Sequence, residues 1–300
     1  MEDNSTQNFS NAKRAEVLTQ ALPFIRKHTG KIIVVKYGGN AMIEDQLKQQ
    51  VMEDIVLLWT IGIKVVLLHG GGPEINDVMQ QMGKEPEFIN GLRVTDKETV
   101  DIVQMVLAGK VNKTLVAMLE SYGGNAMGIS GIDGRLIEAE TKDEKLGFVG
   151  KVTHVNAEPI FDLLNSGYIP VISTVGCDKS GNIYNINGDT AAAHIAGALG
   201  AKRLILMTDI AGILTDKDDR NTLIPELSIS EARKLANDGI INGGMLPKVE
   251  CCIKALNEGV DKVVIMDGRI PHSILMELLT DEGAGTMMVK DGAGKQSRID

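Results

Sequence analysis

Two lysines that lie beside glycines are the residues of this chain best suited to chemistry. Lys36 ends an apolar run and precedes Gly38 and Gly39, and Lys248 follows Gly244 at the head of a predicted helix. A lysine at the end of a buried strand is costly to bury without a partner. Lys36 therefore either extends to the surface or faces an anion. The neighbouring glycines, which let a ligand approach the backbone, favour the anion.

A run of three glycines predicts a second anion site. The apolar residues 65–68 indicate a buried strand, and Gly70–Gly72 and Pro73 follow it before a predicted helix. A strand that passes through glycines into a helix leaves backbone N–H groups unpaired at the positive end of the helix dipole. A sharp turn without a ligand is the alternative, although one glycine would be enough for such a turn.

Three polar residues elsewhere have the chemistry to hold or orient anions. Arg93 follows a glycine-leucine pair and precedes Thr95 and Asp96, a predicted helix N-cap pair. An arginine in this place can bind a carboxylate through two hydrogen bonds, and a surface arginine is the alternative. Asn185 and Asp189 lie four residues apart and share a face while the chain is extended. Asp189 can equally serve as the N-cap of the next helix.

The order of predicted elements brings these residues to one edge of a sheet. Short apolar strands alternate with helices, which implies a mostly parallel sheet covered on both faces, a three-layer α/β/α sandwich. Ligands of such sheets bind beyond the carboxyl ends of the strands. Lys36, the glycines after His69, and Asp209 all fall at such ends. We therefore predict a single active cleft.

The inventory of this cleft suits phosphoryl transfer. It contains cations and glycine loops, and we find neither a nucleophile–base pair nor a metal-binding cluster in the sequence. Phosphoryl transfer mainly requires that reactants be positioned and that spreading negative charge be neutralised. Mg²⁺ bound to a nucleotide is the expected ion, since it keeps waters and phosphate oxygens as ligands. Neither a GxxxxGK[ST] motif nor a GxGxxG motif after a strand is present.

The pattern of apolar residues places the elements as follows. Apolar periodicity predicts helices over 11–28, 45–60, 73–82, 96–108, 110–122, 156–166, 191–199, 230–237, 248–258 and 272–279. Apolar runs predict strands over 31–37, 63–69, 169–173, 203–208, 261–266 and 285–289. Residues 125–155 indicate a small β section, and residues 1–10 are polar and without periodicity.

Composition excludes several classes of protein. The net charge of -9 argues against binding to nucleic acid or to a membrane surface. The three cysteines have no CxxC spacing, which fits a reducing cytoplasm and neither a zinc site nor a disulfide framework. The first thirty residues lack an apolar core of signal-peptide length, and we expect no segment long enough to span a bilayer. The predicted location is therefore cytoplasmic.

The first predicted helix carries an apolar stripe at helical spacing, and Pro23 within it predicts a kink. The stripe packs either on its own domain or on another subunit, and the sequence does not favour one of these. It consists of Val17, Leu18, Ala21, Leu22 and Ile25.

Five motifs occur in an order that resembles the N-acetyl-L-glutamate kinases of the amino acid kinase family. The resemblance runs from about residue 30 to the C-terminus, and the ordered set is far more specific than any one motif. The motifs are Lys36-Tyr37-Gly38-Gly39-Asn40-Ala41, His69-Gly70-Gly71-Gly72-Pro73, Gly91-Leu92-Arg93-Val94-Thr95, Asn185-Ile186-Asn187-Gly188-Asp189 and Gly244-Met245-Leu246-Pro247-Lys248.

The resemblance implies the amino acid kinase fold and ATP-dependent phosphorylation, with Mg²⁺, of the γ-carboxylate of N-acetyl-L-glutamate, the second step of arginine synthesis. It implies three parts of the chain. These are an oligomerisation arm over 1–28, a substrate-binding and dimerisation lobe over 29–175, and a nucleotide-binding lobe over 176–300. The implied catalytic residues are Lys36, Lys248 and Asp189. The implied substrate contacts are Gly71, Gly72, Arg93 and Asn185. The implied nucleotide contacts are Gly38, Gly39, Thr208, Asp209, Gly212 and Gly244.

The N-terminal helix and the segment 282–286 also resemble the arginine-inhibited, hexameric members, in which such helices join three dimers into a ring. The implied arginine contacts are Lys202, His272 and Glu282, and a PII-type signalling protein is a further possible partner. Two alternatives remain at this point. One is a sister enzyme that acts on carbamate, aspartate or glutamate, and the other is a non-catalytic sensor of arginine or nucleotide.

Overall fold

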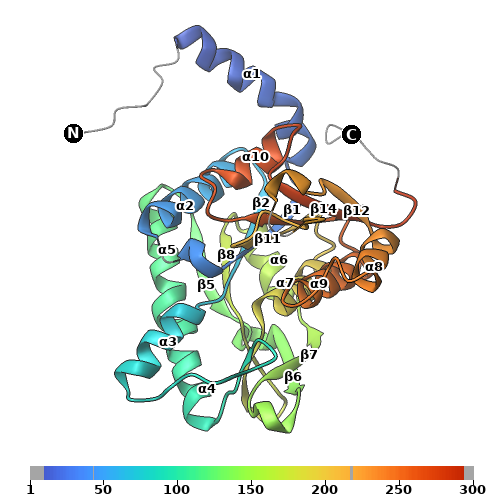
Figure 1. Ribbon diagram of the computed structural model, residues 1–300. Helices are drawn as coiled ribbons and strands as arrows, with labels where there is room; N and C mark the ends of the chain where they lie inside the picture. Colours follow the sequence, from blue (N-terminus) through green and yellow to red (C-terminus); the bar gives the residue numbers. More distant parts are fainter. Residues whose placement is uncertain (1–9, 43, 217–218, 294–300) are drawn as a thin grey trace, which may run out of the picture.

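The computed structural model describes residues 10–42, 44–216 and 219–293, and its core is an eight-stranded sheet. The strand order is β12-β14-β13-β11-β1-β2-β8-β5 (Figure 1). Six neighbouring strands, β13 to β5, are mutually parallel, and β14 is antiparallel to β13. The strands are β1 (Ile32–Tyr37), β2 (Lys64–His69), β5 (Ala126–Ser130), β8 (Ile169–Ser173), β11 (Arg203–Thr208), β12 (Glu226–Ser228), β13 (Lys262–Asp267) and β14 (Gly285–Val289).

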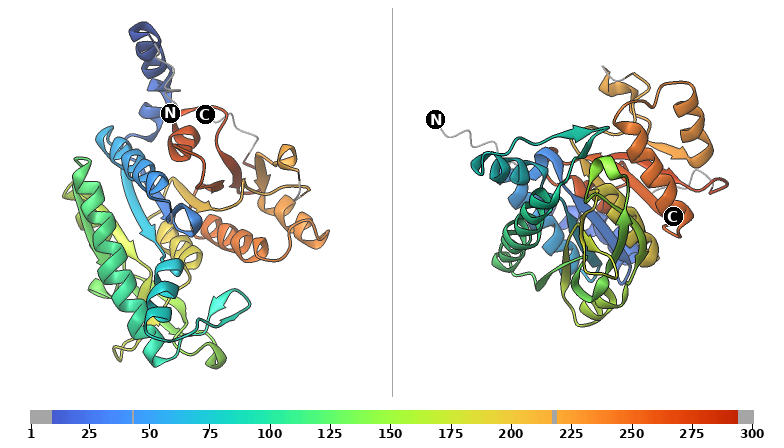
Figure 2. Two further views of the ribbon diagram at one scale, coloured as in Figure 1. Left: turned by 60° about the vertical axis from the view of Figure 1, so that its left-hand side comes forward. Right: turned by 90° about the horizontal axis from the view of Figure 1, so that it is seen from below.

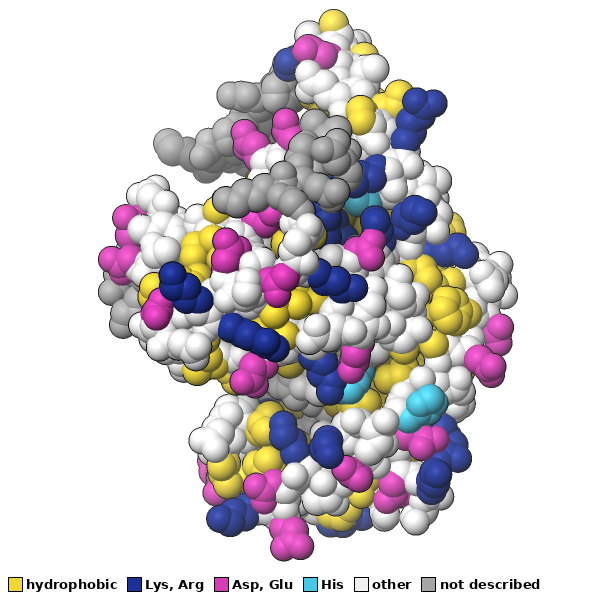
Figure 3. Space-filling view, turned by 90° about the vertical axis from the view of Figure 1, so that its right-hand side faces the viewer, with side chains coloured by type: hydrophobic (Ala, Val, Ile, Leu, Met, Phe, Trp, Pro, Cys, Tyr) yellow, Lys and Arg dark blue, Asp and Glu magenta, His cyan; other side chains and the backbone are white. Residues whose placement is uncertain are grey.

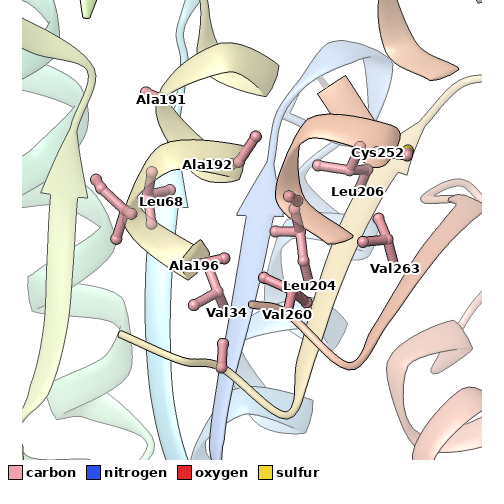
Figure 4. Packing of buried hydrophobic residues seen from close by; sticks show 14 of the residues in the cluster. Val34, Leu68, Ala191, Ala192, Ala196, Leu204, Leu206, Cys252, Val260 and Val263 are labelled. Carbon is pink, nitrogen blue, oxygen red and sulfur yellow. The ribbon is translucent and has the colours of Figure 1, made fainter. Parts of the chain in front are cut away.

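The central strands are apolar on both faces because helices cover both faces. In β1, Ile33 and Val35 belong to one buried cluster and Val34 to the other. Figure 4 shows the second cluster, where Ala192 and Ala196 of one helix and Cys252 of another lie over Val34 and Leu204. Small alanine side chains let that helix approach the sheet closely. The predicted three-layer sandwich with a mostly parallel sheet is confirmed.

Two groups of helices form the outer layers. The first cluster draws residues from α2 (Asp45–Thr60), α3 (Gly72–Gln81), α4 (Lys97–Gln104), α5 (Asn112–Ser121) and α10 (Ser273–Leu279). The second draws residues from α6 (Glu158–Asn165), α7 (Gly188–Ala198), α8 (Ile229–Asn237) and α9 (Met245–Asn257). Short 3₁₀ turns occupy Gly39–Met42, Asp133–Arg135, Glu144–Leu146 and Arg220–Thr222.

A second, four-stranded sheet lies beside the carboxyl ends of the main strands. Its order is β10-β9-β6-β7, with β6 (Ile137–Thr141), β7 (Gly150–Val155), β9 (Val175–Cys177) and β10 (Ile183–Asn185). A two-stranded hairpin joins β3 (Phe88–Ile89) to β4 (Leu92–Arg93). The β section predicted over 125–155 is confirmed as strands β5, β6 and β7, which are divided between two sheets, since β5 pairs in parallel with β8 in the main sheet.

The segment after the hairpin forms one long helix where the sequence predicted two. Residues Met105–Val111 form a π-helix that joins α4 to α5 without a break. By length and composition alone, Lys97–Ser121 could cross a membrane, so the expectation that no segment reaches that length is wrong. However, 44% of its most apolar window is buried inside the protein. It supplies Val103, Leu107 and Leu115 to the first cluster, as a core helix does.

The N-terminal helix α1 (Asn11–His28) begins at a Ser10 N-cap and projects from the body of the protein (Figures 1 and 2). Its end is anchored, since Phe24 and His28 are buried. Most of the predicted stripe is not covered within the protomer, because Val17 and Leu18 are 50% and 71% exposed. The helix continues through Pro23. The irregular chain predicted over 1–10 lies outside the described residues except for Ser10.

The strand β1 sits where the connections reverse direction. From β1 the chain moves to β2 on one side, and it later returns to β11 on the other side. A crevice opens beyond the carboxyl ends of the strands at such a switch point, and ligands of α/β sheets bind there. Lys36 lies on β1 at this point.

Candidate active site

Two lysines and one aspartate meet at the carboxyl end of β1. The Nζ atom of Lys36 lies 3.0 Å from Oδ1 of Asp189, and the Nζ atom of Lys248 lies 2.7 Å from Oδ2 of the same carboxylate. The side chains of Lys36 and Asp189 are 12% and 11% exposed, and that of Lys248 is 23% exposed. One carboxylate thus holds two cations that lie 212 residues apart in the sequence.

Two glycines make room for the Lys36 side chain. A Cβ atom at Gly38 would lie 2.9 Å from the Lys36 Nζ atom, and one at Gly188 would lie 3.1 Å from its Cε atom. A side chain at position 38 would crowd the ammonium group itself, and one at position 188 would crowd the methylene group next to it. Glycine at position 38 therefore leaves space for the Lys36 ammonium group, and it also leaves the backbone accessible to a ligand.

Asp189 and Lys248 both lie near the N-terminus of a helix. Asp189 lies in the first turn of α7, and Lys248 lies in the first turns of α9. The alternative that Asp189 caps its helix is wrong, because the N-cap is Asn187, whose side chain accepts from the N–H group of Thr190. Since Asn187 caps the helix, the Asp189 carboxylate remains available to both lysines.

The lysines keep Asp189 ionised. Burial raises the pKa of this carboxyl group, but Lys36 and Lys248 outweigh burial and hold its pKa well below the usual range. The group is therefore an anion at neutral pH and a poor acceptor of a further proton. It can orient the two ammonium groups, but it cannot act as a general base.

The glycine run lies next to β1 at the end of β2. Gly71 is the N-cap of α3, and it provides no side chain to cap the first N–H groups of the helix. A Cβ atom at Gly71 would lie 2.6 Å from Cδ2 of Leu107, which comes from the π-helix. The glycine is required here because Leu107 fills the space beside it.

The substrate-binding residues predicted from the sequence line one cavity of about 210 Å³. Gly71, Gly72, Arg93 and Asn185 all border it. The structure therefore brings together residues from three separate segments of the chain. Apolar side chains, including those of Ile75, Phe88 and Leu107, complete its wall.

Arg93 is a buried cation in this cavity. The residue is 7% exposed, and its guanidinium group lies 4.8 Å from the centre of the Phe88 ring and donates to the carbonyl oxygen of Gly72 over 3.2 Å. Among the described residues, we find no carboxylate within ion-pair distance of it. Burial lowers the pKa of Arg93, which shows that desolvation is not balanced by an acid. A ligand carboxylate would supply the missing charge.

Asn185 is oriented by a residue that we did not single out as a site. Its side-chain nitrogen donates to Oγ1 of Thr95 over 3.3 Å, and Thr95 in turn donates to the carbonyl oxygen of Arg93 over 2.8 Å. The two segments 91–95 and 185–189 are thereby joined. Their proximity could not be inferred from a separation of ninety residues.

A larger cavity of about 780 Å³ lies on the other side of Lys248. It is bordered by Thr208, Asp209, Gly212 and Gly244, as well as by Lys248. Four of the six residues predicted to bind nucleotide therefore share one cavity with a lysine of the trio. Gly38 and Gly39 do not border it, and Gly38 instead packs against Lys36.

The cations of the cleft are individually placed and are not part of a basic surface. On the face drawn in Figure 3, basic and acidic side chains are interspersed. Among the described residues, no three His, Cys, Asp or Glu side chains lie close enough together to hold a metal ion.

Comparison with known proteins agrees with this geometry. Residues 31–267 match the amino acid kinase family. The chain belongs to that family. It is 54% identical to an acetylglutamate kinase of Brachyspira hyodysenteriae over 95% of this chain and 100% of that one. It is 52% identical to an acetylglutamate kinase of Thermosynechococcus vestitus over 96% and 98% of the two chains.

Solved structures of other proteins share the fold. The N-acetylglutamate synthase of Neisseria gonorrhoeae, in complex with coenzyme A and N-acetyl-glutamate, superposes with a TM-score of 0.81 at 26% identity, over 93% of this chain and 64% of that one. The carbamate kinase of Giardia superposes with a TM-score of 0.66 at 19% identity, over 87% and 99% of the two chains, and it supports the fold alone.

The three residues predicted to bind arginine have different surroundings. Lys202 forms an ion pair with Asp261. The Nδ1 atom of His272 lies 2.6 Å from Oδ1 of Asp54, a buried residue of α2. Glu282 is exposed. The roles of the three residues stay predictions.

Proposed function

We propose that this chain transfers the γ-phosphoryl group of ATP to the γ-carboxylate of N-acetyl-L-glutamate, the second step of arginine biosynthesis. One observation carries the proposal: Lys36 and Lys248 meet on Asp189, and of two nearby cavities one is lined by Lys248 and the other by Arg93, Asn185 and the glycine run. Relatives at 50–54% identity that are named acetylglutamate kinases support it.

The proposed mechanism is charge neutralisation along one line. An oxygen of the substrate carboxylate forms a bond to the γ-phosphorus atom, the bond to the bridging oxygen breaks, and ADP leaves. The attacking carboxylate is already ionised at neutral pH, so the step needs no general base. Lys36 and Lys248 flank the migrating group, the N–H groups of Gly71 and Gly72 bind its oxygens, and Asp189 keeps the lysines in place.

Each half of the chain binds one of the two substrates in this proposal. Residues 29–175, with Asn185, bind the acetylated substrate, and residues 176–300 bind the nucleotide. Thr208, Asp209, Gly212 and Gly244 border the nucleotide, while Gly38 and Gly39 close the cleft around Lys36. Mg²⁺ that enters with ATP supplies further positive charge at the phosphate oxygens.

Arg93 binds the substrate α-carboxylate in this proposal. We expect Arg93→Ala to raise KM for N-acetyl-L-glutamate by about 10- to 100-fold, since a hydrogen-bonded charge contributes roughly 1.5–3 kcal/mol. KM for ATP should stay near the wild-type value. Steady-state kinetics with each substrate varied in turn measures both constants. Arg233→Ala, on the exposed face of α8, is the control. An unchanged KM for the acetylated substrate contradicts this role for Arg93.

A substrate panel tests the proposed activity. The purified chain is assayed with ATP, Mg²⁺ and either N-acetyl-L-glutamate, L-glutamate, L-aspartate or carbamate, and acyl phosphate is trapped as the hydroxamate. ADP release, measured in parallel, reports turnover of carbamate. We expect turnover of N-acetyl-L-glutamate above that of the other acceptors. A preference for another acceptor assigns the chain to a sister kinase, and no turnover with any acceptor favours a sensor.

We extend the proposal to assembly and feedback inhibition. The uncovered residues Val17, Leu18 and Leu22 of α1 form an apolar stripe that fits a second subunit, so we propose that α1 joins dimers into a hexamer. L-Arginine then inhibits through Lys202, His272 and Glu282, and a PII-type signalling protein is a candidate partner. The three cysteines are free thiols, in keeping with a cytoplasmic enzyme.

Removal of the arm tests this extension. Deletion of residues 1–27 should convert hexamers to dimers and weaken inhibition by arginine, because the stripe and the anchoring Phe24 are lost. Light scattering coupled to gel filtration measures the mass, and the doubly substituted Leu18→Glu, Leu22→Glu chain leaves the helix in place as a second test. A truncated protein that remains hexameric contradicts the role of α1.

A further inference from the structure

A fully buried asparagine connects the π-helix to the glycine run. Asn112 is the first residue of α5 and is 0% exposed. Its side-chain nitrogen lies 3.1 Å from Nε2 of His69, 2.9 Å from the carbonyl oxygen of Val171 and 3.2 Å from that of Ile129. Its side-chain oxygen accepts from Nζ of Lys113 over 3.0 Å. Three neighbouring strands, β2, β8 and β5, are thus joined by one amide group.

These contacts determine which way the amide points. Carbonyl oxygens only accept hydrogen bonds, and a lysine ammonium only donates them. The nitrogen of Asn112 must therefore face Val171 and Ile129, and its oxygen must face Lys113. The atom that meets His69 is consequently a donor.

The tautomer of His69 is determined by the Gly70 carbonyl oxygen and agrees with a donor at Asn112. The Gly70 carbonyl oxygen, 2.8 Å from Nδ1, can only accept, so Nδ1 must carry the proton of the neutral ring, and Nε2 is left as an acceptor that faces the Asn112 amide nitrogen. The ring is 0% exposed, and burial lowers the pKa of His69 to about 4, so it is neutral at physiological pH.

The carbonyl group that His69 holds belongs to the same peptide unit as the N–H group of Gly71. This unit is trans, and in a trans peptide the C=O and N–H bonds point in opposite directions. When the Gly70 oxygen is held toward the His69 ring, the Gly71 N–H bond points away from it. Gly71 borders the substrate cavity.

We propose that Asn112 and His69 are positioning residues, which fix the peptide between Gly70 and Gly71 so that the Gly71 N–H group stays aimed at the migrating phosphoryl group. The inference deepens the proposed function and rests on it for the identity of the bound group. Neither residue is among those that border the substrate cavity. The π-helix has a role in this arrangement, because it sets both Leu107 against Gly71 and Asn112 against His69.

Gly128 gives independent support for the importance of the amide. A Cβ atom at this position would lie 2.0 Å from Oδ1 of Asn112 and 2.8 Å from Nζ of Lys113. The space on β5 is therefore reserved for the polar end of Asn112. The backbone of Gly128 also accepts from Lys113 over 2.8 Å, which holds the lysine that fixes the amide oxygen.

Two substitutions at position 69 separate positioning from packing. His69→Leu removes the donor, and we expect kcat to fall by about 10²–10³, as for the loss of one preorganised N–H donor. His69→Asn places an amide nitrogen the same number of bonds from the backbone as Nδ1, and it should recover kcat at least about tenfold over the leucine variant. Calorimetric binding of a non-hydrolysable ATP analogue should be unchanged in both, which shows that they are folded.

His154→Leu, an exposed histidine on β7, is the matched control and should leave kcat unchanged. Equal kcat values for His69→Leu and His69→Asn, both folded, overturn the inference. So does a kcat for His69→Leu within about twofold of wild type.

Nitrogen NMR of the wild-type chain tests the tautomer without any activity. With ¹⁵N-labelled histidine, the His69 ring, assigned by its loss in His69→Asn, should show a protonated Nδ1 and an unprotonated Nε2 at neutral pH. Asn112→Asp, whose carboxylate can only accept, should add a proton at Nε2 while Nδ1 stays protonated against the Gly70 carbonyl oxygen. A wild-type ring protonated at Nε2 overturns the inference. Failure of the substrate panel would instead overturn the proposed function and leave this result intact.

Discussion

Replacement of Lys36 by methionine is expected to lower kcat by about 10²–10³ or more, with little change in KM for either substrate. The ammonium group is held at 3.0 Å from Asp189 and between two glycines, so it is in place before the reaction begins. Its charge acts mainly when negative charge spreads over the migrating phosphoryl group. Methionine keeps most of the length of the side chain and removes only the charge.

Steady-state kinetics of Lys36→Met and Lys248→Met tests this result. The matched control is Lys64→Met, another strand lysine, which lies at the amino end of β2 and donates to Asn165. The control should keep wild-type kcat. A Lys36→Met enzyme with near-wild-type kcat would remove this residue from the mechanism.

Replacement of Asp189 by asparagine should affect both activity and stability. Without the carboxylate, two largely buried ammonium groups lose their shared partner, and loss of a buried ionic partner costs about 3–5 kcal/mol of unfolding free energy. The lysines also repel each other and leave their positions. We therefore expect kcat to fall at least as far as in either lysine variant.

The stability difference should depend on pH in a defined direction. The pKa of Asp189 is depressed in the folded chain, so its contribution is fully present above the unfolded pKa of about 3.9 and is lost as pH falls toward the folded pKa. Urea unfolding of wild type and Asp189→Asn should give a constant difference from pH 5 to 8 and a shrinking one below about pH 4.

The matched control for this variant is Asp101→Asn. Asp101 pairs with Lys97 at 2.9 Å on the exposed face of α4, where an ion pair contributes about 0–1 kcal/mol. A stability difference that stays constant down to pH 2, or that equals the control, would contradict the assignment of Asp189 as the shared counter-ion.

Much of the architecture could be predicted from the sequence because its signals are local. Apolar runs such as residues 32–35 and 65–68 determine the buried strands, and helical periodicity determines α2 and α7. The strand-end rule then placed Lys36, the glycines and Asp209 at one edge. The capping side chain of Asp96 was also predictable, since it depends on its immediate neighbours.

The features that could not be predicted from the sequence depend on contacts between distant segments. The sequence of residues 126–130 is that of a short strand, and only its pairing with β8 places it in the main sheet. The π-helix at Met105–Val111 arises where Leu107 and Asn112 must meet the glycine run and His69, and no local signal marks that need. Asn187 competes with Asp189 as the helix cap, and the two lysines decide between them.

The place of β1 in the sheet also has a consequence for folding during translation. Its residues 32–37 leave the ribosome early, yet one of its two edges pairs with residues 203–206, which are made about 170 residues later. At 5–20 residues per second, that edge stays unpaired for about ten to thirty seconds. An open, strongly apolar strand is a template for association with other nascent chains. We therefore expect nascent chains of this protein to be most prone to association before residues 203–206 are made.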